Sequence, residues 1–428
     1  MGAAPRRDRL LGQARRGAGT HRHRQVRAHR LIFLRLPRRR ARIPTSVKQT
    51  TPFRYVADAA ELDAAFARLH QVPVVALDTE FERSRTYFAR PALIQIYDGE
   101  TVFLLDPLGL PDMGPLGKFL ADQRVRKILH ACREDLELLY QLTGELPRPL
   151  CDTQILAAFA GFGIGVGYRN LVETLCDVQL PKDQTRSNWL KRPLSPPQLQ
   201  YAANDVRHLL TVEKELRSRI GDSERLQWAD ADSTRLVNGF NDAPVTGTIL
   251  EKLPGAWQLE RKGLAVSAAA WAWREDEAQR RDRPRRHILD DAALVAIGQR
   301  RPETFDDLAG MSELPDSLHG PRAAGLLAAI ADALSQPEEK WPQSVPGPND
   351  LGSLTGTIRR LKRTVRATAE ALELPPELLA GNRVVSKLVR RDVFDGRRDL
   401  PPELDGWRAE VIGRRLLDAL DQEATPPN

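Results

Sequence analysis

The stretch Val74-Val75-Ala76-Leu77-Asp78-Thr79-Glu80 joins four apolar residues to two carboxylates that stand one residue apart. The apolar run predicts a short buried β-strand. Because successive side chains of a strand point to opposite faces, Asp78 and Glu80 are expected on the same side. Two neighbouring carboxylates repel each other unless a cation lies between them. The stretch therefore predicts one part of a divalent-metal site.

The composition is that of a soluble globular protein with several domains. The chain has 428 residues, of which 41% are hydrophobic and 28% charged, and this length favours roughly two to four domains. No apolar run is long enough to cross a bilayer, so no membrane partner is expected. Cys132, Cys151 and Cys176 are too scattered for a disulfide framework, and no zinc-binding spacing occurs. This cysteine usage fits a reducing cytoplasm, which is the expected location.

The formal net charge of +7 is unevenly distributed along the chain. Residues 1–42 contain 14 Arg, no Lys and a single acid, which gives this segment +13 and leaves −6 for the remainder. We interpret residues 1–45 as a disordered basic leader, since such a segment cannot build a core. A leader that is disordered, or translated from upstream of the true start, is favoured over a nucleic-acid arm or a transit peptide.

Residues 51–222 show the alternating strand and helix patterns of an α/β domain. The Asp98-Gly99-Glu100 sequence is a hairpin turn signal, and together with the strand at 74–80 it predicts an antiparallel meander of three strands. The Gly161–Gly167 run lacks the G-x-G-x-x-G spacing, which favours a flexible connection over a nucleotide site. The other expected elements are strands at 92–97, 101–105 and 127–131 and helices at 61–69, 133–142, 152–159, 169–176 and 195–216.

The remainder of the chain has helical periodicity and no convincing strand. Residues 251–335 form a first predicted helical domain, and 336–350 contain four prolines typical of a linker. Residues 351–422 form a second helical domain. The two helical blocks share an order of long polar helix, basic loop and Leu/Ala-rich final helix, which indicates diverged copies.

Three further acidic positions stand out, and two of them can complete a metal site. Asp135 follows a predicted strand at the start of a helix, and Asp205 shares a helix face with Tyr201, four residues earlier. Four carboxylates can hold two hard cations, Mg²⁺ or Mn²⁺, through oxygen ligands. Tyr201 would then orient the attacking water, because its usual pKa near 10 disfavours full general-base action. Asp152 is most simply the N-cap of its helix.

Each of these residues also has a purely structural interpretation. An Asp at a strand end is often a turn residue, and Asp135 alone could be an acid that favours the positive end of a helix dipole. His130, at the end of a strand, is more often a structural histidine than a ligand. The metal-site interpretation therefore rests on the whole set in its order.

Taken in that order, the residues resemble the ribonuclease D family, in the DEDDy branch of the 3′–5′ exonucleases. Asp78-Thr79-Glu80-Phe81 resembles the first family motif, His130 to Asp135 the second, and Tyr201 to Asp205 the third. Trp189 and Arg192-Pro193-Leu194 precede the third motif as in the family. The region from Ala272-Trp273-Arg274 to Arg283-Pro284-Arg285 is similar to an HRDC domain, and the last helical block resembles a second one more weakly.

The resemblance implies an α/β ribonuclease H-like exonuclease domain followed by two all-α HRDC-type helical domains. It also implies two divalent cations held by Asp78, Glu80, Asp135 and Asp205, and release of 5′-mononucleotides from 3′ ends of structured RNA such as tRNA precursors. Two alternatives stay open: a 3′–5′ exonuclease acting on DNA in repair, and a catalytically silent nucleic-acid-binding scaffold.

Since the body of the chain is acidic, RNA must be held by local patches. Residues 280–286 and 359–366 are two basic runs, although a solvated face explains such runs equally well. Aromatic residues after the first motif could stack on a base, although core packing explains them too. The candidate nucleic-acid contacts are Phe81, Tyr87, Arg186, Arg192, Arg281, Arg285, Arg360 and Arg363.

Overall fold

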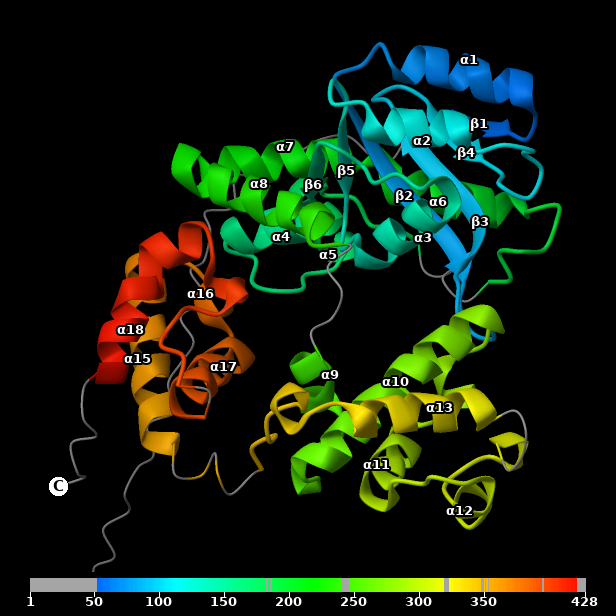
Figure 1. The fold of residues 1–428 in the computed structure, drawn as a ribbon. Coiled ribbons are helices and arrows are strands. Elements are labelled where there is room, and N and C mark those ends of the chain that lie inside the picture. Colours follow the sequence, from blue (N-terminus) through cyan, green and yellow to red (C-terminus); the bar gives the residue numbers. More distant parts are fainter. Residues whose placement is uncertain are drawn as a thin grey trace, which may run out of the picture. The chain divides into compact units, whose positions relative to one another are not determined.

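The computed structural model (Figure 1) describes residues 52–421 except 182–183, 185–186, 241–245, 319–322, 348–349, 351, 353 and 395. The predicted basic leader at 1–45 lies outside these residues. No helix in the described ranges is both long and apolar enough to span a membrane.

One six-stranded sheet organises residues 53–152, with the strand order β1-β4-β3-β2-β5-β6. β2 pairs antiparallel with β3, and β3 with β4, which confirms the predicted meander, whereas the other three pairings are parallel. At the predicted turn, Asp98 Oδ1 accepts hydrogen bonds from the backbone N–H groups of Glu100 and Thr101, at 2.8 and 2.7 Å. The strands are β1 (Phe53–Val56), β2 (Val74–Glu82), β3 (Arg90–Tyr97), β4 (Val102–Leu105), β5 (Arg126–Leu129) and β6 (Leu150–Asp152).

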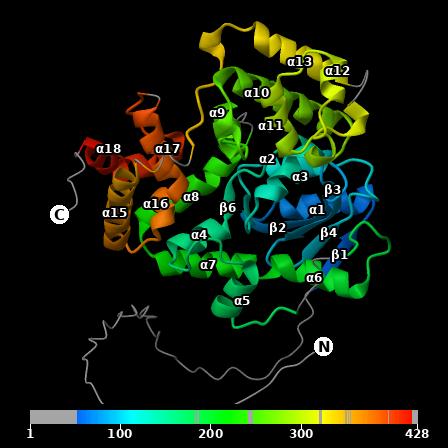
Figure 2. The same ribbon diagram turned by 90° about the horizontal axis from the view of Figure 1, so that it is seen from below.

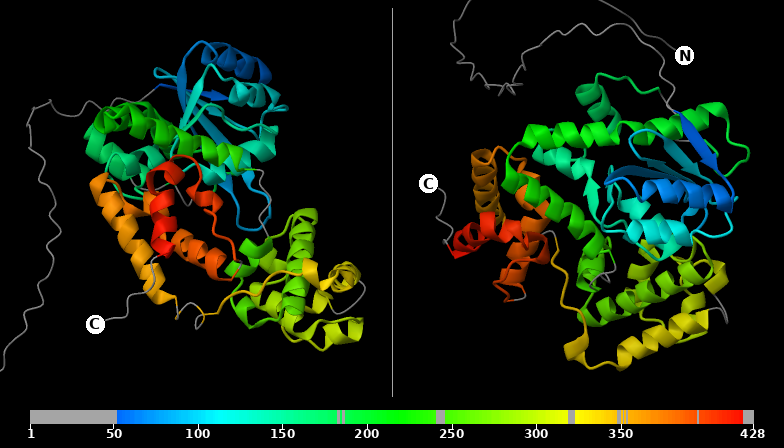
Figure 3. Two further views of the ribbon diagram at one scale, coloured as in Figure 1. Left: turned by 60° about the vertical axis from the view of Figure 1, so that its left-hand side comes forward. Right: turned by 90° about the horizontal axis from the view of Figure 1, so that it is seen from above.

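Helices cover both faces of this sheet, as Figures 2 and 3 show. Leu77, Ile96 and Phe103 belong to a hydrophobic core with α1 (Ala59–Leu69), α2 (Gly114–Ala121) and α3 (Arg133–Thr143). Ala76, Leu93 and Leu104 point to the opposite face because strand side chains alternate. Their core includes residues of α4 (Thr153–Phe159), α5 (Tyr168–Cys176), α6 (Pro196–Arg207) and α7 (Leu209–Ile220).

The predicted helix from Ser195 is interrupted at one residue. Its start is confirmed, since the Gln198 side chain accepts a hydrogen bond from the Ser195 backbone N–H at 3.0 Å. The single continuous helix that was predicted is wrong, because α6 ends at Arg207 and α7 begins at Leu209. His208 between them, with φ −100° and ψ −9°, is the C-cap of α6 and the N-cap of α7.

The described residues from 223 to 421 form helices and contain no strand, as the periodicity predicts. The first of these helices, α8 (Ser223–Asn238), was not predicted. The others are α9 (Thr246–Lys252), η1 (Ala256–Gln258), α10 (Arg261–Arg280), η2 (Arg285–His287), α11 (Asp291–Arg300), α12 (Phe305–Ala309), η3 (Asp316–Leu318), α13 (Ala324–Ser335), η5 (Glu338–Lys340), α15 (Thr355–Ala371), α16 (Pro376–Ala380), α17 (Asn382–Val393), η6 (Pro402–Leu404), η7 (Ala409–Gly413) and α18 (Arg414–Asp421).

The two helical blocks differ in how their cores are built. Residues 250–330 contribute a hydrophobic cluster of their own. The buried residues of 361–420 belong instead to the cluster that covers one face of the sheet, which they join through Trp228 of α8. The last helical block is therefore tied to the sheet-containing part of the chain by a shared core.

Lys127 of β5 gives a prediction about pH, since its fully buried ammonium donates to the carbonyls of Asp122 and Arg148. Burial lowers the pKa of Lys127 to about 8, below the value of about 10.4 for an unfolded lysine. Between these values the unfolded state binds more protons, so stability rises with pH. Between pH 8 and 10.4 we expect the free energy of unfolding of wild type to rise by on the order of 2 kcal/mol relative to that of Lys127→Met. Urea unfolding at a series of pH values measures both free energies. A constant difference would contradict this.

Candidate active site

The end of β2 presents two of the predicted metal ligands to a single cavity. Asp78 and Glu80 line a cavity of about 240 Å³ together with Tyr201 and Asp205. Since the two acids are two residues apart on one strand, both point to the face covered by α6. The strand pairing shifts register between Glu80 and Phe81, directly after the second acid. The β2 geometry predicted from the alternation is thus what brings these carboxylates together.

Asp135 reaches the same cluster from the first turn of α3. It is 8% exposed, and the Thr79 hydroxyl donates a hydrogen bond to its Oδ1 at 2.5 Å. Thr79, the residue between the two acids of β2, therefore fixes the third acid. This contact joins residues 56 positions apart and was not predicted.

Asp152 holds the turn from which Asp135 projects. It caps α4 as predicted, accepting from the backbone N–H of Gln154 at 2.8 Å. Its two oxygens also accept from the backbone N–H groups of Ala131 and Cys132, both at 3.0 Å. Ala131 has φ +57°, a conformation that costs energy for a residue with a side chain. Asp152 thus stabilises the strained passage from β5 into α3.

Helix α6 contributes the fourth acid and the tyrosine. The side chain of Tyr201 hydrogen-bonds Asp205, as the spacing of four residues on a helix allows. The ring of Tyr201 also lies 6.0 Å from that of Trp189, which is 4% exposed. The buried Trp189 ring thus provides a support for the tyrosine at the cavity wall.

The four carboxylates are held in a state that disfavours negative charge. Burial raises the pKa of Asp78 well above its usual value, with further contributions from Asp135, Asp205 and Glu80. Burial followed by the charges of Asp205 and Asp135 raises the pKa of Glu80 to about 9. Burial is also the main reason that the pKa values of Asp135 and Asp205 rise to about 6 and about 7. Such a cluster favours the binding of cations.

The donor set fits hard divalent cations. All four groups are carboxylates, and oxygen is the donor that Mg²⁺ and Mn²⁺ prefer. Among the described residues, no three carboxylate, imidazole or thiol groups already converge closely enough to enclose an ion.

The cavity has further polar lining that the sequence did not single out as functional. His130, Tyr168, Arg169 and Asn204 complete its polar wall. The His130 ring makes a 2.9 Å hydrogen bond with the Thr153 hydroxyl, and its Nε2 is buried without a hydrogen-bond partner. His130 belongs to the second motif, and this position in the sequence is the signal that favours a functional over a structural interpretation.

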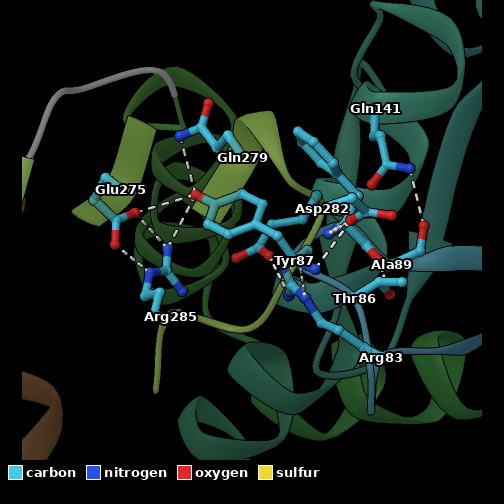
Figure 4. A network of polar contacts seen from close by, with 11 residues as sticks. Arg83, Thr86, Tyr87, Ala89, Gln141, Glu275, Gln279, Asp282 and Arg285 are labelled. Atoms are coloured by element: carbon cyan, nitrogen blue, oxygen red, sulfur yellow. Dashed lines mark hydrogen bonds and ion pairs between the residues drawn. The ribbon is translucent and has the colours of Figure 1, made fainter. Parts of the chain in front are cut away.

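The predicted nucleic-acid contacts are mostly engaged within the protein. Tyr87 and Arg285 lie against each other, with the guanidinium carbon 4.8 Å from the ring centre, as Figure 4 shows. Arg192 pairs with Asp106 at 2.6 Å, and Arg281 pairs with Glu277. Arg360 donates a hydrogen bond to the Ala419 carbonyl at 2.7 Å. Phe81 is half-buried on β2, and Arg363 is exposed on α15. Arg186 lies outside the described residues.

Comparisons with known proteins show the family to which the chain is similar. The model of the 3′–5′ exonuclease family matches residues 53–221, and the HRDC domain model matches residues 263–330. Ribonuclease D of Pseudomonas paraeruginosa is 36% identical over 367 residues, covering 86% of this chain and 97% of that protein. Ribonuclease D of Escherichia coli is 34% identical over 356 residues, covering 82% and 93%. The crystal structure of E. coli RNase D matches with a TM-score of 0.77 and 31% identity, covering 86% and 98%.

The mixed sheet with acids on β2, α3 and α6, followed by an HRDC domain, defines a nuclease of the 3′–5′ exonuclease class. The exonuclease fold of this class is metal-dependent. The chain belongs to the ribonuclease D family of 3′–5′ exoribonucleases.

Proposed function

We propose that this enzyme uses two divalent cations, Mg²⁺ or Mn²⁺, to release 5′-mononucleotides from the 3′ ends of structured RNA such as tRNA precursors. The observation that carries the proposal is a group of four carboxylates, three of which (Asp78, Glu80 and Asp205) line one small cavity. Burial, followed by the charges of its acidic neighbours, Asp135 among them, raises the pKa of Asp78 and that of Glu80. RNA as substrate follows the family, and its E. coli member is described as an exoribonuclease involved in structured RNA processing. We further propose that it acts in the cytoplasm.

We also propose a division of labour along the chain. Residues 51–222 form the exonuclease domain, 251–335 the HRDC domain, 336–350 a linker and 351–422 a second HRDC-like domain. The separate hydrophobic cluster of residues 250–330 supports the second of these boundaries. The helical domains would hold the body of a structured RNA while its 3′ end enters the cavity.

The residues of the cavity have separate tasks in hydrolysis. Bound divalent cations would lower the pKa of the attacking water and neutralise the leaving 3′ oxygen. Asp78, Glu80, Asp135 and Asp205 would hold these ions, and Thr79 keeps Asp135 in place through its hydroxyl. The Tyr201 hydroxyl, which hydrogen-bonds Asp205, would orient the water that attacks the phosphorus.

The size of the cavity supports a single-stranded 3′ end as the group that enters. A volume of about 240 Å³, bounded by Leu180, Tyr168 and Tyr201, is too small for a duplex. A double-stranded end would therefore have to unpair before its last nucleotide reaches the acids. This favours trimming of overhanging 3′ tails on structured RNA.

The test compares matched RNA and DNA oligonucleotides carrying a 5′ label, with Mg²⁺, Mn²⁺ or EDTA. We expect a ladder of products shortened one nucleotide at a time on RNA, mononucleotide release, and no cleavage in EDTA. A tRNA precursor with a 3′ tail should stop shortening close to its paired stem. Faster cleavage of DNA would instead support an exonuclease acting in DNA repair.

Tyr201→Phe tests the task assigned to the hydroxyl. The substitution keeps the ring against Trp189 and all four acids but removes the group that orients the water. We expect kcat to fall by roughly 10²- to 10⁴-fold, with KM for RNA changed little, because the loss acts on the transition state. Steady-state kinetics on a short RNA measure both values. An unchanged kcat would remove Tyr201 from the mechanism.

A further inference from the structure

A second cavity, separate from the one that holds the acids, lies beside the loop between β2 and β3. Its volume is about 870 Å³, within the range of ligand-binding sites. It shares no lining residue with the active-site cavity. Residues of the β2–β3 loop, of α3 and of the segment between α10 and η2 all contribute to its wall. The cavity thus exists only where the exonuclease domain meets the HRDC region.

Polar contacts of Tyr87 and Asp282 fix this wall, as Figure 4 shows. The Tyr87 hydroxyl donates to Glu275 at 3.1 Å and accepts from Gln279 at 3.2 Å and Arg285 at 3.1 Å. Asp282 Oδ1 accepts from the backbone N–H groups of Tyr87 and Phe88, both at 3.0 Å. The loop is thereby held in one conformation, and the Tyr87 ring is occupied by its contacts with the HRDC region.

Two aromatic rings at this cavity remain available to a ligand. Phe88 is 38% exposed and Tyr140 of α3 is 39% exposed. Both rings contact another ring of the protein: Phe88 packs edge-on against Tyr87 and Tyr140 lies tilted against Phe240, with centroids 5.0 and 5.2 Å apart. Such contacts orient the two rings while leaving part of each ring exposed, and a flat base can stack on that exposed part.

The charges at the cavity favour an anionic ligand. Arg90 is exposed and makes no ion pair or hydrogen bond with its side chain within the described part of the chain. The two acids of the lining are engaged, since Glu137 pairs with Arg83 at 2.5 Å and Asp282 accepts the two backbone N–H groups. Exposed aromatic rings beside an unpaired arginine are the combination that binds single-stranded nucleic acid.

We propose that this cavity is a second RNA subsite, which stacks unpaired bases of the substrate on Tyr140 and Phe88 and contacts a phosphate through Arg90. The proposal rests on the proposed function, in which RNA is the substrate. Because only the terminal nucleotide enters the active site, the bases held here lie upstream of it. Glu80 in the active site and Arg83 in this wall are three residues apart, at most about 10 Å along an extended chain. One RNA strand can therefore reach both sites.

The test uses the full-length enzyme with Mg²⁺ and measures kcat and KM for RNA of two and of eight nucleotides. Tyr140→Leu and Phe88→Leu keep apolar contacts but remove the stacking surface. We expect each to raise KM for the octanucleotide about 5- to 30-fold, with KM for the dinucleotide and kcat unchanged. Arg90→Gln should make the salt dependence of octanucleotide binding shallower by about 0.7 in the log–log slope.

Matched controls come from β1, where Phe53 is 36% exposed and Arg54 is exposed, and neither lines either cavity. Phe53→Leu and Arg54→Gln should leave both KM values unchanged, and melting temperatures show whether each variant folds. Equal effects on the two substrates, or no effect on either, would overturn the proposal and leave the cavity as a packing or protein-binding surface. Failure of the wild type to degrade RNA would instead reject the proposed function.

Discussion

Asp78→Asn is expected to lower exonuclease activity by at least about 10³-fold and to stabilise the metal-free protein. In the proposed mechanism one ion would lose a ligand, and a loss of about 4 kcal/mol of transition-state stabilisation gives this factor. The stability rises because Asp78 is buried beside Asp135, Asp205 and Glu80, which repel its charge. Asparagine has the same shape without the charge. We expect a melting temperature about 2–4 °C higher at pH 7 in EDTA.

The pH dependence of that gain follows from the sign of the pKa shifts. The pKa values of Glu80 and Asp205 are raised to about 9 and about 7 by folding, so the unfolded state binds fewer protons at neutral pH. The stability of wild type therefore falls as pH rises from about 4. The advantage of Asp78→Asn should shrink as the pH falls towards 4, because these carboxyls are then protonated in the folded state and become increasingly protonated in the unfolded state as well.

Metal titration separates this explanation from a general effect on folding. Mn²⁺ should raise the melting temperature of wild type, since it binds the folded state, and should do so much less for Asp78→Asn. Glu134→Gln is the matched control, because Glu134 is exposed in the first turn of α3, next to Asp135. It should retain activity and the Mn²⁺ response. Comparable activity in Asp78→Asn and wild type would contradict the assigned role of Asp78.

The parts of the fold that were predictable carry strong local signals. The apolar run before Asp78, the turn at Asp98 and the Ser195 cap each specify structure within a few residues. β1 and β6, of four and three residues, and the Gly- and Pro-containing α2 were missed. Their sequences have too few residues for a periodic pattern, and tertiary pairing decides their conformation.

The same distinction applies to the site. Its four acids were predictable because they form an ordered set, although their mutual distances depend on the folded sheet. The contacts of Tyr87 were not predictable, since its partners lie 188 to 198 residues further along the chain. From the sequence, the position of Tyr87 after the first motif fitted stacking on a base as well as it fitted packing in the core. Only the fold shows that its neighbour Phe88 is the ring left exposed.

Trp407→Ala is expected to produce the largest loss of stability among the substitutions considered, about 3–5 kcal/mol. The Trp407 ring is 7% exposed and stacks on Trp228 of α8, with centroids 4.8 Å apart and planes 11° apart. Its Nε1 donates to Asp232 at 3.1 Å, and Arg408 pairs with the same carboxylate at 2.6 Å. Removing the ring leaves a cavity and exposes Trp228 to water. Urea unfolding followed by tryptophan fluorescence measures the change.

The loss of stability in Trp407→Ala should be concentrated in the contact between the last helical block and α8. We therefore expect trypsin to cut residues 355–421 of Trp407→Ala at lower urea concentrations than it does in wild type, before the sheet unfolds. Trp257→Ala is the matched control, since Trp257 is 47% exposed and its truncation should cost well under 1 kcal/mol. If Trp407→Ala unfolds in one step at the wild-type urea concentration, the shared core does not hold the last helical block to the exonuclease domain. Loss of the octanucleotide and dinucleotide activities together would show that this block supports the catalytic sheet itself, because α4 contacts Trp407 through Phe159 at 5.7 Å.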